Sequence, residues 1–169
     1  MTPRLLTPTY WPLVVSLTLM FWLGGTVVLD VLVMPGLYWG GLMHQAGFVS
    51  FGYFLFGWFN HAELLCAALV MTSVLAQALT QPQRYWPGLA LAGTLVGIVL
   101  LDTYLLTPWM GATGITLDWL EQDIPTIPVP ARMNLLHGGY LGLEGLKVAV
   151  AGGLLWWQWR FLPASERLD

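Results

Sequence analysis

The sequence is poor in charged residues and almost lacks cysteine. Of its 169 residues, 6 are Lys or Arg and 9 are Asp or Glu, a charged fraction of 9% against about 25% in soluble domains. A soluble globule and a disordered tail are therefore excluded. The few basic residues and the net charge of -3 cannot form the basic face of a nucleic-acid-binding protein, so no nucleic-acid partner is expected. The single cysteine, Cys66, excludes an intrachain disulfide and a cysteine-rich metal motif.

Known catalytic signatures are also missing. The sequence contains no Gly-x-Ser-x-Gly elbow, no phosphate-binding glycine loop and no His-Glu-x-x-His motif, so the chain is not expected to be an enzyme. Hydrophobic residues instead make up 57% of it. This composition indicates an integral membrane protein that has the lipid bilayer as its main partner.

Four apolar segments are long enough to cross a hydrocarbon layer about 30 Å thick, which takes about 20 helical residues. They are residues 11–36, 51–78, 86–110 and 133–161. Prolines interrupt the chain near their ends, and Pro108 closes the third segment. Tyr and Trp gather at the ends of the segments as they do at lipid headgroups. No internal repeat is found. We therefore expect one all-α membrane domain over residues 1–169, a four-helix bundle. In the third connection, 111–132, the pattern predicts a short amphipathic helix on the membrane surface.

The distribution of arginine predicts the orientation. Basic residues in short loops remain on the cytoplasmic side of a membrane. Four spans place both termini and the 79–85 connection on one face, which carries four arginines against one on the other face. The four are Arg4, Arg84, Arg160 and Arg167, and the one is Arg132. Both termini are therefore expected in the cytoplasm, with the protein in a plasma or inner membrane.

Polar side chains inside the expected spans mark the candidate site. A charge at the bilayer centre costs about 2.5–3.5 kcal/mol on insertion scales, so such residues normally face the interior of a bundle. Their estimated depths favour the middle and outer half of the membrane, which predicts a polar cavity open to the outer side. The candidate residues are Asp30, Asn60, His61, Glu63, Asp102, Asn134, His137, Glu144 and Lys147.

Lys147 is expected to pair with Glu63, Glu144 or both. Glu63 and Lys147 lie at similar estimated depths, and Glu144 is one turn away from Lys147. At 100° per residue, Asn134, His137 and Glu144 share one stripe of the last span. Two hypotheses remain open: the pair fixes the register of the helices, or it belongs to a proton or ion relay.

No cofactor is expected, although two alternatives remain. His61 and His137 lie on different spans and are able to ligate a haem iron, but their estimated depths differ by roughly 10 Å. A divalent metal site would combine these two histidines with Asp102 and Glu144, whose ligand types suit zinc or copper. The sequence has no His-x-x-x-His spacing to favour such a site.

Several short motifs resemble the transmembrane-protein-205-like family of small four-span membrane proteins. The motifs lie in the first three expected spans, in the first connection and at the start of the last span. They are Trp22-Leu23-Gly24-Gly25, Pro35-Gly36-Leu37-Tyr38, Ala46-Gly47-Phe48, Phe51-Gly52-Tyr53-Phe54, the segment 102–108, and 132–138 with His137-Gly138. The resemblance implies four spans and no particular reaction.

The sequence therefore predicts a non-enzymatic membrane protein built around a polar cavity. One alternative is a small transporter, or a protein that handles metal ions or protons, using the same cavity. Another is an accessory subunit that docks onto other membrane subunits or forms a homo-oligomer, because glycines along the last span allow close helix approach. A docking subunit would turn small or polar residues outward, whereas a transporter would turn them inward.

Overall fold

We describe the protein from a computed structural model, which describes residues 10–42, 45, 47–121 and 131–161. All regular elements within these residues are helices, so the predicted all-α fold class is confirmed. The elements form four continuous stretches, and two of the stretches contain a π-helical turn. The first stretch comprises α1 (Tyr10–Val27), η2 (Val28–Val33) and α2 (Met34–Trp39); the second is α3 (Phe48–Thr80); the third comprises α4 (Pro82–Leu101), η4 (Asp102–Leu106) and α5 (Thr107–Glu121); the fourth is α6 (Ala131–Phe161).

Three of these stretches are long and apolar enough to cross a membrane. They are Tyr10–Trp39, Phe48–Thr80 and Pro82–Gly114, of 30, 33 and 33 residues. The fourth predicted span falls within α6, which has 31 residues but is not among the three. Glu144 and Lys147 lie in the middle of α6 and lower its apolar character.

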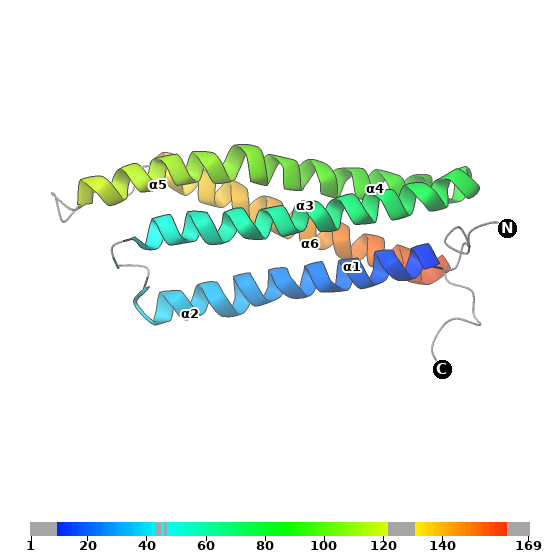
Figure 1. The fold of residues 1–169 in the computed structure, drawn as a ribbon, viewed down its shortest axis with the longest axis horizontal. Coiled ribbons are helices and arrows are strands. Elements are labelled where there is room, and N and C mark those ends of the chain that lie inside the picture. Colours follow the sequence, from blue (N-terminus) through cyan, green and yellow to red (C-terminus); the bar gives the residue numbers. More distant parts are fainter. Residues whose placement is uncertain (1–9, 43–44, 46, 122–130, 162–169) are drawn as a thin grey trace.

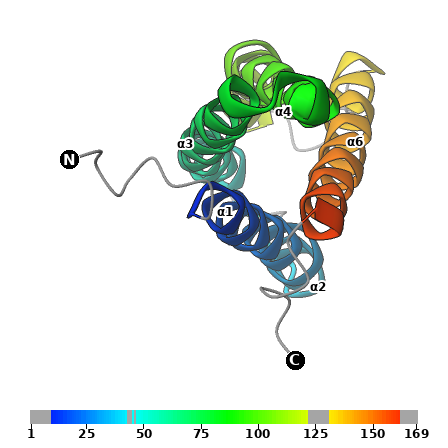
Figure 2. The same ribbon diagram turned by 90° about the vertical axis from the view of Figure 1, so that its right-hand side faces the viewer.

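The four stretches lie side by side and form a ring when viewed along the bundle (Figures 1 and 2). Going around the ring, α1 contacts α3, α3 contacts α4, α4 contacts α6, and α6 contacts α1. Helix α3 therefore lies diagonally opposite α6, and α1 lies diagonally opposite α4. The start of α1 and the end of α6 are at the same end of the bundle (Figure 1).

The third stretch continues farther than predicted. Pro108 was expected to end it and to be followed by a separate amphipathic helix. Instead, α5 continues the helix through Pro108 to Glu121. The π-helical turn η4 lies directly before α5. We attribute the continuity to this wider turn, which relieves the clash between a proline ring and the carbonyl four residues earlier.

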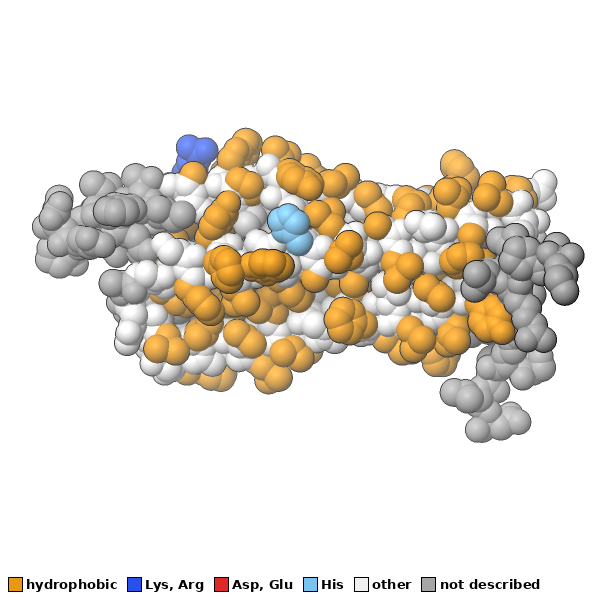
Figure 3. Space-filling model, in the orientation of Figure 1, with side chains coloured by type: hydrophobic (Ala, Val, Ile, Leu, Met, Phe, Trp, Pro, Cys, Tyr) orange, Lys and Arg blue, Asp and Glu red, His pale blue; other side chains and the backbone are white. Residues whose placement is uncertain are grey.

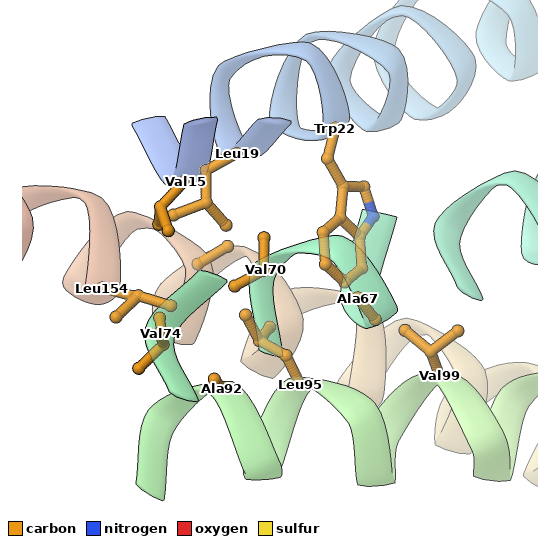
Figure 4. Packing of buried hydrophobic residues seen from close by; sticks show 11 residues of the cluster. Val15, Leu19, Trp22, Ala67, Val70, Val74, Ala92, Leu95, Val99 and Leu154 are labelled. Carbon is orange, nitrogen blue, oxygen red and sulfur yellow. The ribbon is translucent and has the colours of Figure 1, made fainter. Parts of the chain in front are cut away.

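A core of apolar side chains fills the interior of the bundle in the half of its length where α1 begins. It is formed by residues from all four stretches, and Figure 4 shows them pointing toward one another. Its fully or nearly fully buried members are Val15, Leu19, Trp22, Ala67, Val70, Val74, Ala92, Leu95, Val99, Ala151 and Leu154.

The outer surface is also apolar. Hydrophobic side chains cover the face in Figure 3 along the whole length of the bundle. Large side chains are strongly exposed, among them Phe21 at 73%, Leu65 at 74% and Leu135 at 77%. Apolar groups on the outside are typical of a protein whose solvent is lipid.

Candidate functional site

Lys147 lies at the centre of the bundle and contacts two carboxylates. Its side chain extends from α6 and Glu63 lies on α3, so the contact joins two helices at opposite corners of the ring. The Lys147 Nζ donates to Glu63 Oε1 at 2.6 Å and to Oε2 at 2.7 Å. The same nitrogen donates to Glu144 Oε1 at 2.5 Å. All three residues are buried, at 1–4% exposed.

Trp22 of α1 completes the surroundings of Glu63. Its indole Nε1–H donates to Glu63 Oε1 at 2.8 Å, and the residue is 3% exposed. The charged cluster of Glu63, Glu144 and Lys147 is therefore fixed from three of the four helical stretches. Trp22 is a site residue that the sequence alone does not single out. Its position in the middle of a span, away from the aromatic residues at the span ends, was the available signal.

Asn60 and Asp102 extend the buried polar layer, and both are 0% exposed. Asn60 Nδ2 donates to the Thr107 hydroxyl at 2.7 Å and so joins α3 to α5. Asp102 begins η4. It is near enough to Glu63, Glu144 and Lys147 to interact with their charges.

The remaining candidates are not fully buried in this layer. Asp30 in η2 is half-buried and near enough to Glu144 and Lys147 to interact with their charges. His61, Asn134 and His137 are exposed. Each histidine uses its Nδ1–H to donate to a carbonyl of its own helix, at Gly57 for His61 and at Met133 for His137. The prediction that these three exposed side chains share one cavity with the charged cluster is therefore not supported by the described residues.

Helix geometry explains why the histidines point away. His61 precedes Glu63 by two residues, which is 200° around the helix. On α6 the inward positions before Glu144 are Tyr140, Leu136 and Met133. This path steps back by four, four and three residues, so Leu136 takes the inward position that the seven-residue spacing had assigned to His137.

A haem or metal site formed by both histidines is likewise not assembled. His61 and His137 are on the outside of the bundle, whereas Asp102 and Glu144 are inside it. In the part of the chain that the structure describes, no group of three or more His, Cys, Asp or Glu side chains is placed to hold a metal ion.

The polar layer is closed and does not line an open cavity. Asn60, Glu63, Asp102, Glu144 and Lys147 are 0–4% exposed, so the described residues show no opening of this layer toward one side. These side chains contact one another or are covered by neighbouring helices. A groove of about 350 Å³ exists elsewhere, on the outer surface between α1 and α3. Its lining is almost entirely apolar: Leu17, Thr18, Phe21, Leu65, Cys66 and Leu69.

The first and third helical stretches contain similar segments directly before Asp30 and Asp102, a similarity that does not stand out in the sequence. Asp30 and Asp102 each lie in a π-helical turn, on the diagonally opposed first and third stretches. Five residues match at identical spacing over the eight positions that end at each aspartate. The matching segments are Leu23-x-Gly25-x-Val27-x-Leu29-Asp30 and Leu95-x-Gly97-x-Val99-x-Leu101-Asp102.

Comparison with known proteins identifies no relative. No protein-family model matches the chain, and neither the curated proteins nor the solved structures contain a significant match. The site must therefore be interpreted from its own geometry.

Proposed function

We propose that the chain is a non-enzymatic, multi-pass integral membrane protein in which the charged cluster fixes four membrane-spanning helices in one register. The observation that carries this proposal is that charged side chains lie inside the bundle and apolar side chains cover its outside, the reverse of a soluble protein. Glu63, Glu144 and Lys147 are 1–4% exposed, whereas large apolar side chains face outward. Buried ionic groups are best known for fixing register and assembly, and less for adding stability.

The proposal includes α6 as the fourth span. Its 31 residues exceed the roughly 20 that a bilayer requires. Its two central charges offset each other because Lys147 contacts Glu144 directly as well as Glu63. This pairing lowers the free-energy cost of placing the helix in hydrocarbon. A hydropathy score counts each charged residue by itself and does not include this pairing. The resemblance to the transmembrane-protein-205-like family also belongs to the proposal and agrees with four spans.

We further propose that both termini are cytoplasmic, in a plasma or inner membrane. Arg84 and Arg160 lie at the end of the bundle where α1 begins, and Arg132 lies at the start of α6 at the opposite end. The Arg160 guanidinium stacks 4.6 Å from the Trp156 ring centre. Such pairs of arginine and aromatic residues suit the headgroup layer.

Cysteine labelling in intact cells tests whether α3 crosses the membrane and in which direction. In a Cys66→Ser background, we expect Gln45→Cys to react with a membrane-impermeant maleimide from outside. We expect Gln83→Cys to react only after permeabilisation, because it lies in the first turn of α4, just beyond the opposite end of α3. Labelling of both positions from the same side would contradict the arrangement, and labelling of only Gln83→Cys would reverse the direction.

A second candidate function is docking onto another membrane helix through α6, and one observation favours it. Gly138, Gly142 and Gly145 are exposed, and a Cβ placed on any of them would meet no atom within 4 Å. Outward-facing small residues permit close helix contact in lipid.

Fluorescence energy transfer between labelled molecules in liposomes tests whether this face pairs with a second copy of the chain. If it does, the transfer is lower in Gly142→Leu than in the parent. It persists in Gly24→Leu, a matched change on α1; equal transfer in both variants would contradict docking through α6.

A further inference from the structure

Asp102 is a completely buried acid without a hydrogen-bond partner. Its side chain is 0% exposed, and neither carboxylate oxygen accepts a hydrogen bond from the described residues. The adjacent Thr103 hydroxyl, 7% exposed, is also without a partner. Leaving a buried polar group unpaired costs about 1–3 kcal/mol, and more if the group is charged. An ionised Asp102 is therefore a costly state for this bundle.

The charges around Asp102 do not balance. Among the described residues, the buried charged side chains are three acids, Glu63, Asp102 and Glu144, and one base, Lys147. With all four ionised, the interior would hold two uncompensated negative charges. Lys147 already contacts Glu63 from α3 and Glu144 from α6. These three residues are the charged groups whose charges act on Asp102, and Lys147 is the only buried cation within the part of the chain that the structure describes.

The hydrogen bonds of the interior do not compensate this charge at Asp102. Unpartnered buried oxygens include both of Asp102, Oε2 of Glu144 and Oδ1 of Asn60. Ionised carboxylates and amide oxygens only accept hydrogen bonds. Buried hydroxyl groups that could donate, at Thr103 and Tyr140, are also unpartnered and do not reach Asp102. A proton on Asp102 removes its charge and turns one of its two unpartnered oxygens into an O–H donor.

We propose that Asp102 is a proton-binding site of the bundle interior. The carboxylate takes up one proton from the aqueous phase and becomes a neutral carboxylic acid, which raises the net charge of the protein by one. Asp102 is the acid that fits this role because Lys147 contacts the other two carboxylates directly, whereas no described side chain donates a hydrogen bond to Asp102. The inference rests on the proposed membrane bundle and adds a ligand, the proton, to an interior that otherwise only fixes register.

Infrared spectroscopy of the full-length protein in lipid bilayers tests the site. A protonated carboxyl group has a carbonyl stretch that is separate from that of a carboxylate. We expect this band at neutral pH in the parent, a shift on ¹³C labelling of aspartate, and its loss in Asp102→Asn. Asp30→Asn is the matched control, since Asp30 has the same preceding motif but is half-buried, and the band should persist there.

Several results would overturn the proton site. They are absence of the band in the parent, its persistence in Asp102→Asn, and its removal at constant pH by sodium ions, which would identify a metal-cation site instead. A stability measurement guards against a variant that merely misfolds. Asp102→Asn keeps a neutral group of similar shape, so its melting temperature should match that of the parent at neutral pH. A clear loss of stability would show that the negative charge is required. The cysteine labelling described above tests the membrane arrangement separately.

Discussion

Replacing Lys147 by methionine is expected to lower the free energy of unfolding by about 3–5 kcal/mol. The substitution removes the base that Glu63 and Glu144 share inside the bundle, where Lys147 is 1% exposed. Methionine fills a similar volume, so the loss comes mainly from two buried acids left without their partner. Unfolding of the purified protein in mixed micelles, followed by circular dichroism, measures the change.

Two further variants show that the loss arises from the charges. Leu146→Met alters the neighbouring residue, which is 47% exposed, and should change stability by no more than about 0.5 kcal/mol. Adding Glu63→Gln and Glu144→Gln to Lys147→Met removes the orphaned acids and should recover most of the stability, because neutral replacements of whole buried ion pairs are often tolerated. A Lys147→Met protein that unfolds together with the parent would contradict the role of the pair.

Replacing Trp22 by alanine is expected to cost about 3–5 kcal/mol, as for other large-to-small changes in a core. The indole is 3% exposed and packs in the cluster that joins all four helical stretches (Figure 4). Trp22→Phe keeps a six-membered aromatic ring but loses the bond from Nε1–H to Glu63 and a part of the indole volume. A hydrogen bond to a charged group contributes about 1.5–3 kcal/mol, so phenylalanine should have the smaller effect. The same unfolding assay measures both variants.

Trp58 provides the matched control for Trp22. It lies on α3 but is 67% exposed and faces outward, so Trp58→Phe should be nearly neutral. Equal losses in Trp22→Phe and Trp58→Phe would show that the indole bond to Glu63 contributes nothing. An effect of Trp22→Phe that disappears once Glu63 is changed to glutamine would support the charged hydrogen bond specifically.

Much of the fold follows from patterns that the sequence displays directly. Long apolar runs fix the number and approximate limits of the helices, because a helix in lipid must satisfy its backbone internally. The estimated membrane depths of the side chains predicted that Lys147 pairs with Glu63, and the spacing of one helical turn predicted its contact with Glu144. Both contacts are present in the structure. Depth is a reliable guide because the rise per residue varies little between helices.

Other features depended on rotation and local helix geometry, which the sequence determines only loosely. His137 follows the stripe of Glu144 in an ideal helix, yet Leu136 is the residue that turns inward. Pro108 is a usual helix breaker, but the π-helical turn η4 allows the helix to continue. Gly138, Gly142 and Gly145 of α6 face outward, because Glu144 and Lys147 turn the opposite side of α6 inward.

The contact between Lys147 and Glu63 across the bundle axis is the claim on which the account depends, and solid-state nuclear magnetic resonance can measure it. The sequence contains a single lysine, so labelling lysine with ¹⁵N at Nζ reports on this site alone. With glutamate labelled by ¹³C at the carboxyl group, we expect dipolar coupling from the lysine nitrogen to two carboxyl carbons, and to one in Glu63→Gln. A lysine nitrogen that shows no coupling to any glutamate carboxyl carbon in lipid bilayers would contradict the account.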